Sequence, residues 1–422
     1  MAVDTPARIA VLGAGPIGLE AAIYARFLGY DVTIIERGEV AENVQRWGHV
    51  CLFSPFSMNH SSLGAAAIVA QGSQNALPKD EELLTGHQWR ERYLLPLSET
   101  DLLSDHLCTN TRVLSLGRPH VLKADLPGVK GRDLQPFQIL LQTSNGVQSV
   151  MAAEIVIDTT GVYGNPNWVG RGGMPAVGET LCRDRIQFGL PDLSTVARKD
   201  FAGKHTLVVG AGYSAATNVV ALSELSESFP ETRVTWITRK VEGQTNAPLP
   251  LIENDQLSER HRLARAANAL CVSSASCVTH LFPASVLAVD YVSESAGFRV
   301  ALDCHVKAEI ECDQILANVG NRPDTSLFQE LQVHQCYATE GPMKVAASLL
   351  AQDTQDCLNQ PAIGAHSLLN PEPNFYVLGA KSYGRNSNFL FSLGLDQIRE
   401  LFSVIGDRTD LDLYAGAKPL LP

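Results

Sequence analysis

Three things are scarce in this chain of 422 residues: long apolar runs, an excess of basic residues, and closely spaced cysteines. No stretch approaches the roughly 18 apolar residues of a membrane helix, and even Leu63–Ala70 is short. The N-terminal apolar run is also too short for a signal peptide, so we expect a cytoplasmic protein without a membrane segment. The net charge of −12 argues against a nucleic-acid partner.

The nine cysteines are an odd number and are scattered along the chain. Neither C-x-x-C nor C-x4-C occurs, and the nearest pairs are Cys271/Cys277 and Cys304/Cys312. A disulfide framework is therefore not expected, and buried thiols in a reduced compartment are the better interpretation. We predict no metal site. With 45% hydrophobic and 18% charged residues, the composition is typical of a globular enzyme of two or three domains.

The stretch Arg8–Glu36 predicts a complete β-α-β unit. The apolar pattern gives in order a strand, a helix and a second strand: Ile9–Leu12, Leu19–Leu28 and Val32–Ile35. Three glycines between the first strand and the helix supply G-x-G-x-x-G: Gly13, Gly15 and Gly18. The first permits a tight turn, the second lets a pyrophosphate approach the backbone, and the third lets the helix pack closely on the strand. Glu36 ends the unit, where an acid can bind a ribose, so we predict a dinucleotide site rather than a Gly-rich structural turn.

A second β-α-β unit is expected further along the chain. Its strand, helix and second strand are His205–Val209, Ala216–Leu225 and Val234–Thr238. The turn contains five candidate ligand-binding residues, with alanine in place of the third glycine: Gly210, Gly212, Tyr213, Ser214 and Ala215. This unit ends in Arg239-Lys240 instead of an acid. An arginine can bind a ribose 2′-phosphate that a carboxylate would repel, so we assign NADPH here, with a solvated strand end as the alternative.

Further secondary structure is predicted around these two units. Helices are expected at Leu63–Ala70 and Leu83–Leu95, and a hairpin at Phe137–Met151 around the Asn145-Gly146 turn. Three more strands end in small-residue turns, which lets their backbones approach a nucleotide: those ending at Gly161, Gly320 and Gly379.

Two dinucleotide units followed by such turns resemble the flavoproteins with two dinucleotide-binding domains. That superfamily contains the flavin-containing monooxygenases, the N-hydroxylating monooxygenases and the thioredoxin-reductase-like disulfide reductases. The resemblance implies an α/β fold of two Rossmann-like domains, with the NADPH domain inserted into the FAD domain. The implied segments are the first part of the FAD domain, the NADPH domain and the FAD return segment: 1–165, 166–319 and 320–422.

The resemblance also implies which residues hold each cofactor. FAD would be held by residues of the first fingerprint, the loop after it and the later strand ends: Gly13, Gly15, Pro16, Ile17, Gly18, Glu36, Arg37, Arg46, Trp47, Val113, Thr160, Gly161, Gly379 and Ala380, and Gly320 is a further predicted cofactor contact. NADPH would be held by Gly210, Gly212, Tyr213, Ser214, Ala215, Arg239 and Lys240. Two family motifs differ: Gly379 is followed by Ala380-Lys381 instead of an acid, and Phe201-Ala202-Gly203 is followed by His205 at the wrong spacing for F-x-G-x-x-x-H.

Three functions follow from this resemblance. The leading hypothesis is an NADPH-consuming, FAD-dependent monooxygenase that oxidises nitrogen, sulfur or carbon of a small molecule through reduced flavin and O₂, with a homodimer as a candidate assembly. A reductase or dehydrogenase passing electrons to a quinone, metal ion or small partner is the alternative, and a redox sensor or scaffold is the third. A disulfide reductase would need two cysteines that exchange with the flavin, at spacings that the chain lacks.

Six polar residues are candidates for lining the flavin and substrate cavity: His49, Asn59, Lys381, Tyr383, Arg385 and Asn388. Lys381 and Arg385 would suit an anionic substrate group. For each of the six, an ordinary core or surface polar residue is the alternative interpretation.

Overall fold

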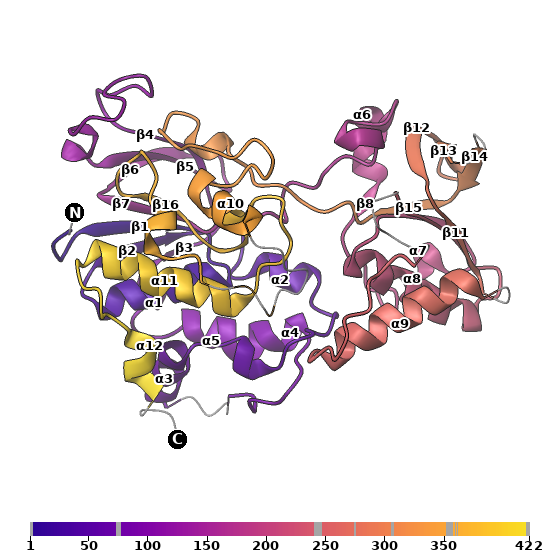
Figure 1. Ribbon diagram of the computed structural model, residues 1–422, viewed down its shortest axis with the longest axis horizontal. Coiled ribbons are helices and arrows are strands. Elements are labelled where there is room, and N and C mark those ends of the chain that lie inside the picture. Colours follow the sequence, from indigo (N-terminus) through magenta and orange to yellow (C-terminus); the bar gives the residue numbers. More distant parts are fainter. Residues whose placement is uncertain are drawn as a thin grey trace. The chain divides into compact units, whose positions relative to one another are not determined.

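The computed structural model describes residues 3–72, 77–239, 247–273, 276–304, 308–351, 358, 360 and 362–418. The chain divides into two compact units, the first formed by residues 1–165 and 322–422 and the second by residues 166–321. Each unit contains one parallel five-stranded sheet and one antiparallel three-stranded sheet (Figure 1). The predicted α/β class with two Rossmann-like domains is confirmed.

The first unit is built on a parallel sheet whose glycine-loop strand lies in the centre. The strand order is β16 (Phe375–Val377), β7 (Ile155–Asp158), β1 (Arg8–Leu12), β2 (Asp31–Ile35) and β3 (Leu107–Cys108). The antiparallel sheet contains β4 (Thr111–Gly117), β5 (Phe137–Thr143) and β6 (Gln148–Ala153), which confirms the predicted hairpin. Because β1 has β2 on one side and β7 on the other, its carboxyl end is a topological switch point, where α/β sheets bind ligands.

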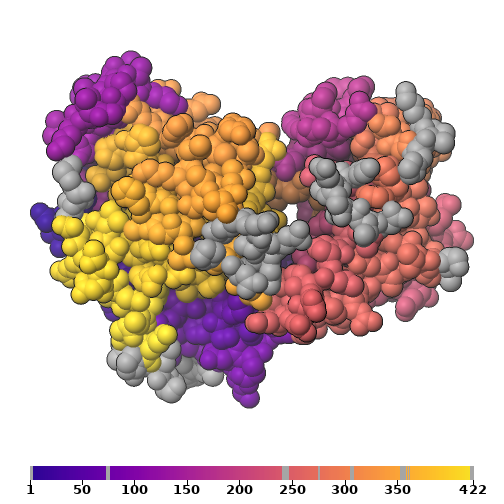
Figure 2. Space-filling view, viewed as in Figure 1, coloured from indigo at the N-terminus to yellow at the C-terminus, as the bar shows by residue number. Residues whose placement is uncertain are grey.

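The helices of the first unit cover one face of its parallel sheet. They are α1 (Pro16–Phe27), α2 (Glu42–Arg46), α3 (Ser62–Ala70), α4 (Gly86–Trp89), α5 (Leu95–Ser98), α10 (Met343–Leu350), α11 (Phe391–Ile405) and α12 (Leu413–Ala417). Ile9 and Val11 point into the core with α1 and α11, whereas Ala10 and Leu12 point into the core with β4 and β5. This alternation is the period of two of a strand buried on both faces. Figure 1 shows the resulting layers, and Figure 2 shows the orange-to-yellow return segment on the surface of this unit.

The predicted helix over Leu83–Leu95 begins later than expected. Thr85 Oγ1 accepts a hydrogen bond from the Gln88 amide and Gln88 Oε1 accepts one from the Thr85 amide, so a capping box starts α4 at Gly86. The segment Arg90–Leu94 continues as a π-helical turn before α5. The helix boundary was therefore wrong by three residues because the cap, not the apolar pattern, sets it.

The second unit repeats the layered plan. Its parallel sheet has the order β11 (Val278–Leu281), β10 (Arg233–Ile237), β9 (His205–Val209), β15 (Gln314–Ala317) and β8 (Gln187–Phe188). The helices are α6 (Glu179–Cys182), α7 (Arg198–Phe201), α8 (Tyr213–Ser228) and α9 (Ser258–Val272). The antiparallel strands are β12 (Ser285–Ser293), β13 (Gly297–Asp303) and β14 (Ala308–Cys312). Val208 packs with α8 and α9, while Leu207 and Val209 pack with β12 and β13.

Candidate dinucleotide sites

The three glycines of the first fingerprint have different surroundings. Gly13 has φ +97°, and a Cβ there would lie 3.1 Å from the carbonyl oxygen of Thr159. A Cβ on Gly18 would lie 1.9 Å from the carbonyl oxygen of Gly13, so α1 contacts the loop backbone directly. A Cβ on Gly15 would have no atom within 4 Å. The fold therefore needs glycine at the first and third positions, while the open space at Gly15 is where a pyrophosphate would approach the backbone.

The start of α1 offers a second feature for anion binding. Gly15 is its N-cap residue, carries no capping side chain, and precedes Pro16 in the first turn. The first amides of the helix therefore have no side-chain partner, and the helix dipole adds positive charge at this end. Ile17 is buried beside the return segment. A Cβ on Gly379 would lie only 3.3 Å from Ile17 Cγ1, so the two residues are close neighbours.

Glu36 is fixed beside the glycine loop. Its carboxylate accepts hydrogen bonds from the Ala14 amide at 2.8 Å and the Gly38 amide at 3.1 Å. A carboxylate has about four acceptor positions, so two remain for ribose hydroxyls. The Thr111 amide donates to the Glu36 carbonyl, which places the start of β4, and Val113 two residues on, next to this end of β2.

The other predicted FAD contacts of the loop after β2 differ in exposure. Arg37 and Arg46 are exposed, and Arg46 pairs with Glu42 at 2.6 Å. Trp47 is half-buried against the helical core of the first unit. The two arginines thus lie on the surface, whereas the tryptophan belongs to the packed loop.

The return segment meets β7 through a buried ion pair that the sequence did not reveal. Lys381 Nζ donates to Asp158 Oδ2 at 2.7 Å and to Thr160 Oγ1 at 2.9 Å, and the side chains of this ion pair are almost fully buried. Gln397 accepts from the Gly379 amide at 2.8 Å, which holds the Gly379-Ala380 turn against α11. These contacts bring together Thr160, Gly161, Gly379 and Ala380 at the carboxyl ends of β7 and β16.

Several of the six predicted cavity residues already have hydrogen-bond or ion-pair partners within the protein. Lys381 is committed to Asp158, and Arg385 pairs with Glu340 at 2.7 Å, so both cations are neutralised by carboxylates. Asn59 is buried and donates to the carbonyls of Ser54 and Pro55, a role in shaping its own loop.

The remaining three cavity candidates are in different surroundings. Tyr383 is buried with its ring edge against Phe389, and burial raises the pKa of Tyr383 to about 12. His49 is exposed, and the half-buried Asn388 donates its amide to Asn386. A role in the flavin and substrate cavity stays a prediction for these six residues.

The second unit repeats the glycine geometry of the first. Gly210 has φ +133°, and a Cβ there would lie 2.2 Å from the carbonyl oxygen of Asn318. Gly212 is exposed, and a Cβ there would have no atom within 4 Å. Ser214 is exposed in the first turn of α8, which has 16 residues. The open glycine and the exposed helix start therefore lie together, as in the first unit.

Other predicted NADPH contacts lie near the ends of the same sheet. Arg239 is exposed two residues after β10, and Lys240 lies outside the described residues. Tyr213 begins α8, and Ala215 in the same turn is fully buried. Ala215 therefore takes the third fingerprint position, where Gly18 packs in the first unit. Gly320, predicted as a cofactor contact but not assigned to NADPH, lies in the second unit, where it has φ +77° and its carbonyl accepts from the Asn167 amide.

Sequence reasoning missed two asparagines that support this second loop. Asn218 Nδ2 donates to Asn318 Oδ1 at 2.8 Å, and both side chains donate to the Gly189 carbonyl. The pair lies 100 residues apart in sequence, so no local pattern signals it.

One thiol in each of the two nearest cysteine pairs has a raised pKa. Burial raises the pKa of Cys271 to about 11 and that of Cys312 to about 12. Since the thiolate is the reactive form, a raised pKa leaves little of either thiol reactive at neutral pH. Among the described residues no cluster of histidine, cysteine or acidic side chains could hold a metal ion, and no helix is long and apolar enough to span a membrane.

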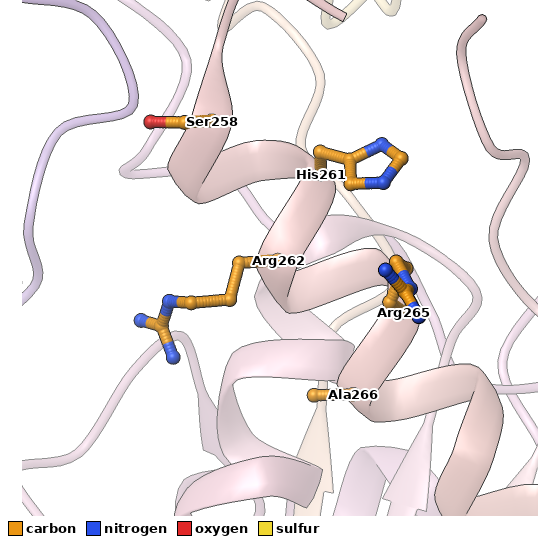
Figure 3. A pocket seen from close by; sticks show the side chains of 5 residues that line it. All are labelled: Ser258, His261, Arg262, Arg265 and Ala266. Carbon is orange, nitrogen blue, oxygen red and sulfur yellow. The ribbon is translucent and has the colours of Figure 1, made fainter.

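A pocket of about 430 Å³ lies elsewhere in the second unit, along α9 (Figure 3). Its described lining comes from this helix alone: Ser258, His261, Arg262, Arg265 and Ala266. No fingerprint residue lines it, so we assign it no part in dinucleotide binding.

Comparisons with known proteins agree with the two-domain fold. Residues 10–108 match the family described as pyridine nucleotide-disulphide oxidoreductase. No curated protein matches the chain. Among solved structures, bacillithiol disulfide reductase from Bacillus cereus has a TM-score of 0.64 at 19% identity, covering 95% of this chain and 99% of that one.

Two further structures broaden the comparison. Thioredoxin reductase from T. acidophilum has a TM-score of 0.55 at 17% identity, covering 94% of this chain and 97% of that one. Ornithine hydroxylase from Pseudomonas aeruginosa has a TM-score of 0.57 at 13% identity, covering 99% and 100%. Reductases and a hydroxylase therefore share this fold, and the fold alone does not choose between them.

Proposed function

The chain has the two-domain fold of the FAD- and NAD(P)H-dependent flavoprotein oxidoreductases, and we propose that it is an NADPH-consuming, FAD-dependent monooxygenase of a small molecule. FAD would bind the first unit and NADPH the second. The observation that carries the assignment is the contrast between the two fingerprints, because β2 is followed by Glu36 and β10 by Arg239.

The residues of the first unit fit FAD. The open backbone at Gly15 and the uncapped start of α1 would bind the pyrophosphate, and the remaining acceptor positions of Glu36 would bind the adenosine ribose. Bound flavin would supply hydride acceptance and reaction with O₂, chemistry that no side chain provides. The protein's part is to fix the cofactor by these contacts and to exclude water from the reacting face.

The second unit fits NADPH in the same way. Gly212 leaves its backbone open, and exposed Ser214 and Arg239 lie near the carboxyl ends of β9 and β10. The arginine would pair with the 2′-phosphate, while α8 would receive the pyrophosphate at its N-terminus.

Cys271 and Cys312, from the two nearest cysteine pairs, are poorly suited to thiol exchange, whereas backbone hydrogen bonds at Thr339 and Ala338 lower the pKa of Cys336. The pKa values of Cys271 and Cys312 are raised by burial, and Cys182 shows the same direction. A monooxygenase needs no nucleophilic side chain, since one NADPH, one proton and O₂ convert the substrate to its oxygenated form, NADP⁺ and water. The proposal therefore does not depend on finding a catalytic dyad.

Rapid mixing of the NADPH-reduced protein with O₂ tests this proposal. We expect a transient absorbance distinct from both reduced and oxidised flavin, and one oxygenated product per NADPH when amines, thiols or ketones are screened. Direct return to oxidised flavin, with hydrogen peroxide equal to the NADPH consumed and faster turnover with a quinone, would identify the alternative reductase instead. A purified protein that binds no FAD would overturn both assignments.

Replacing Arg239 by alanine should weaken NADPH but not NADH. The lost charge-assisted hydrogen bonds are worth about 1.5–3 kcal/mol, so the Kd for NADPH should rise about 10- to 100-fold. Arg233→Ala, an exposed arginine at the start of β10, is the matched control and should leave both affinities unchanged. Equal losses of NADH and NADPH affinity would remove the argument for the 2′-phosphate. Titration of the protein with each nucleotide measures both constants.

A further inference from the structure

The pocket along α9 is lined by two rows of side chains, which Figure 3 shows side by side along the helix. One row contains Ser258, Arg262 and Ala266, and the other contains His261 and Arg265. Residues three or four positions apart are neighbours on a helix surface, so the five side chains form one continuous face. The volume of about 430 Å³ is in the range of small-molecule sites and leaves room for more than an inorganic ion.

The opposite face of α9 holds the helix in place. Ala264 and Ala267 are buried in the core of the second unit together with Val219 of α8. Arg260 forms a buried ion pair with Asp255 at 2.6 Å, which ties the first turn of α9 to the loop before it. These contacts fix the helix without using the side chains of the two rows.

The described lining of the pocket offers hydrogen-bond donors and positive charge but no carboxylate. Arg262 and Arg265 each carry five N–H donors in a planar fork, and the Ser258 hydroxyl can also donate. His261 adds a further positive charge whenever it is protonated. A lining of this kind is complementary to a ligand that is anionic and rich in acceptors.

The two arginines are available to such a ligand. Arg265 is exposed and has no ion-pair or hydrogen-bond partner among the described residues. Arg262 pairs with Glu259 at 2.7 Å, but its side chain is 70% exposed, and an exposed pair contributes little to stability. Like charges at neighbouring positions disfavour a helix, and a bound anion would remove this repulsion.

We propose that the two rows bind a small organic phosphate, with its phosphate held by Arg262 and Arg265. A phosphate monoester carries almost two negative charges at neutral pH, which match the two guanidinium groups, and the forked donors can bind its oxygens in pairs. Ala266 is the apolar member of the lining, and its small side chain leaves space for the organic part. The inference goes beyond the proposed function and does not depend on which dinucleotide either unit binds.

Calorimetric titration of the full chain with ribose 5-phosphate tests the inference, with inorganic phosphate and ribose as separate titrants at constant ionic strength. Arg265→Gln removes one charge, and Ala266→Leu fills the space without changing any charge. Arg198→Gln is the matched control, because it removes an exposed arginine from α7, another helix of the second unit. Each titration is run with and without saturating NADPH.

We expect the wild type to bind ribose 5-phosphate more tightly than inorganic phosphate and not to bind ribose. Arg265→Gln should raise the Kd for both phosphates about 10- to 100-fold, as for the loss of charge-assisted hydrogen bonds. Ala266→Leu should raise the Kd for ribose 5-phosphate alone. The Arg198→Gln control should bind as the wild type does, and NADPH should change none of these constants.

Four results would overturn the inference. Wild-type protein that does not bind ribose 5-phosphate has no such site, and equal affinity for inorganic phosphate would mean an ion site only. Equal losses in Arg265→Gln and Arg198→Gln would mean that binding follows the overall charge. Displacement of ribose 5-phosphate by NADPH would make the pocket part of the dinucleotide site. A protein that binds ribose 5-phosphate but neither FAD nor NADPH would overturn the proposed function and leave this inference standing.

Discussion

Gly15→Ala should strongly weaken FAD binding while leaving the first unit folded. The backbone at Gly15 is extended, with φ −77°, and no protein atom lies within 4 Å of the position that the alanine methyl group would take, so the substitution causes no clash within the protein. The methyl group would instead occupy the space of the pyrophosphate. Overpacking of this kind costs about 2 kcal/mol or more, which is about a 30-fold or greater rise in the Kd for FAD.

Gly18→Ala is the matched contrast three residues away. Its methyl group would lie 1.9 Å from the Gly13 carbonyl oxygen and 2.7 Å from Thr159 Oγ1, so α1 would be forced off the glycine loop. We expect a loss of stability of ~3 kcal/mol in the cofactor-free protein. Thermal unfolding without cofactor, compared with FAD titration, separates the two variants. If Gly15→Ala destabilised the cofactor-free protein as much as Gly18→Ala, the open side of Gly15 would not be a ligand site.

The second unit supplies an internal control for the same experiment. Gly212 is extended, with φ −94°, and equally open, so Gly212→Ala should weaken NADPH and spare FAD. Gly15→Ala should do the reverse. A protein in which both substitutions affected the same nucleotide would contradict the assignment of one cofactor to each unit.

Local chemistry is what made the two fingerprints predictable. Gly13, Gly18 and Gly210 are required by contacts within a few residues or with the adjacent strand, and such requirements leave a fixed spacing in the sequence. The alternation of apolar residues in β1 likewise reports burial on both faces. These elements were predicted because each depends on short-range geometry.

Long-range pairing explains why the partners of the predicted cavity residues could not be read from the sequence. The bond between Lys381 and Asp158 spans 223 residues, and nothing near Lys381 shows that a carboxylate will neutralise it. Asn59 is a cavity candidate by sequence, but its side-chain amide donates to the carbonyls of Ser54 and Pro55 in the fold.

Glu20→Gln should stabilise the protein above neutral pH and remove much of its pH dependence. Glu20 lies on α1, is fully buried, and accepts a hydrogen bond from Tyr93. Burial raises the pKa of Glu20 to about 7, against the opposing hydrogen bonds of Ser61 and Tyr93. The neighbouring Tyr414 hydroxyl is also buried and has no hydrogen-bond partner among the described residues. Burial raises the pKa of Tyr414, and the negative charge of Glu20 acts in the same direction.

The sign of the effect follows from proton linkage. Between its unfolded pKa of 4.5 and its folded pKa of about 7, Glu20 keeps a proton when folded and loses it when unfolded. Stability therefore falls as the pH rises through this window and stays lower above it, by ~3 kcal/mol in total. Glutamine carries no charge, retains an oxygen for Tyr93, and avoids this loss.

Urea unfolding of wild type and Glu20→Gln from pH 5 to pH 8 measures the difference directly. The advantage of the variant should be small at pH 5 and grow by ~2–3 kcal/mol by pH 8. Glu99→Gln, which changes an exposed carboxylate in the same unit, should show no such growth. A constant difference across this range would mean that Glu20 is already ionised in the folded state, and that the buried cluster with Tyr93 and Tyr414 stabilises a carboxylate rather than a carboxylic acid.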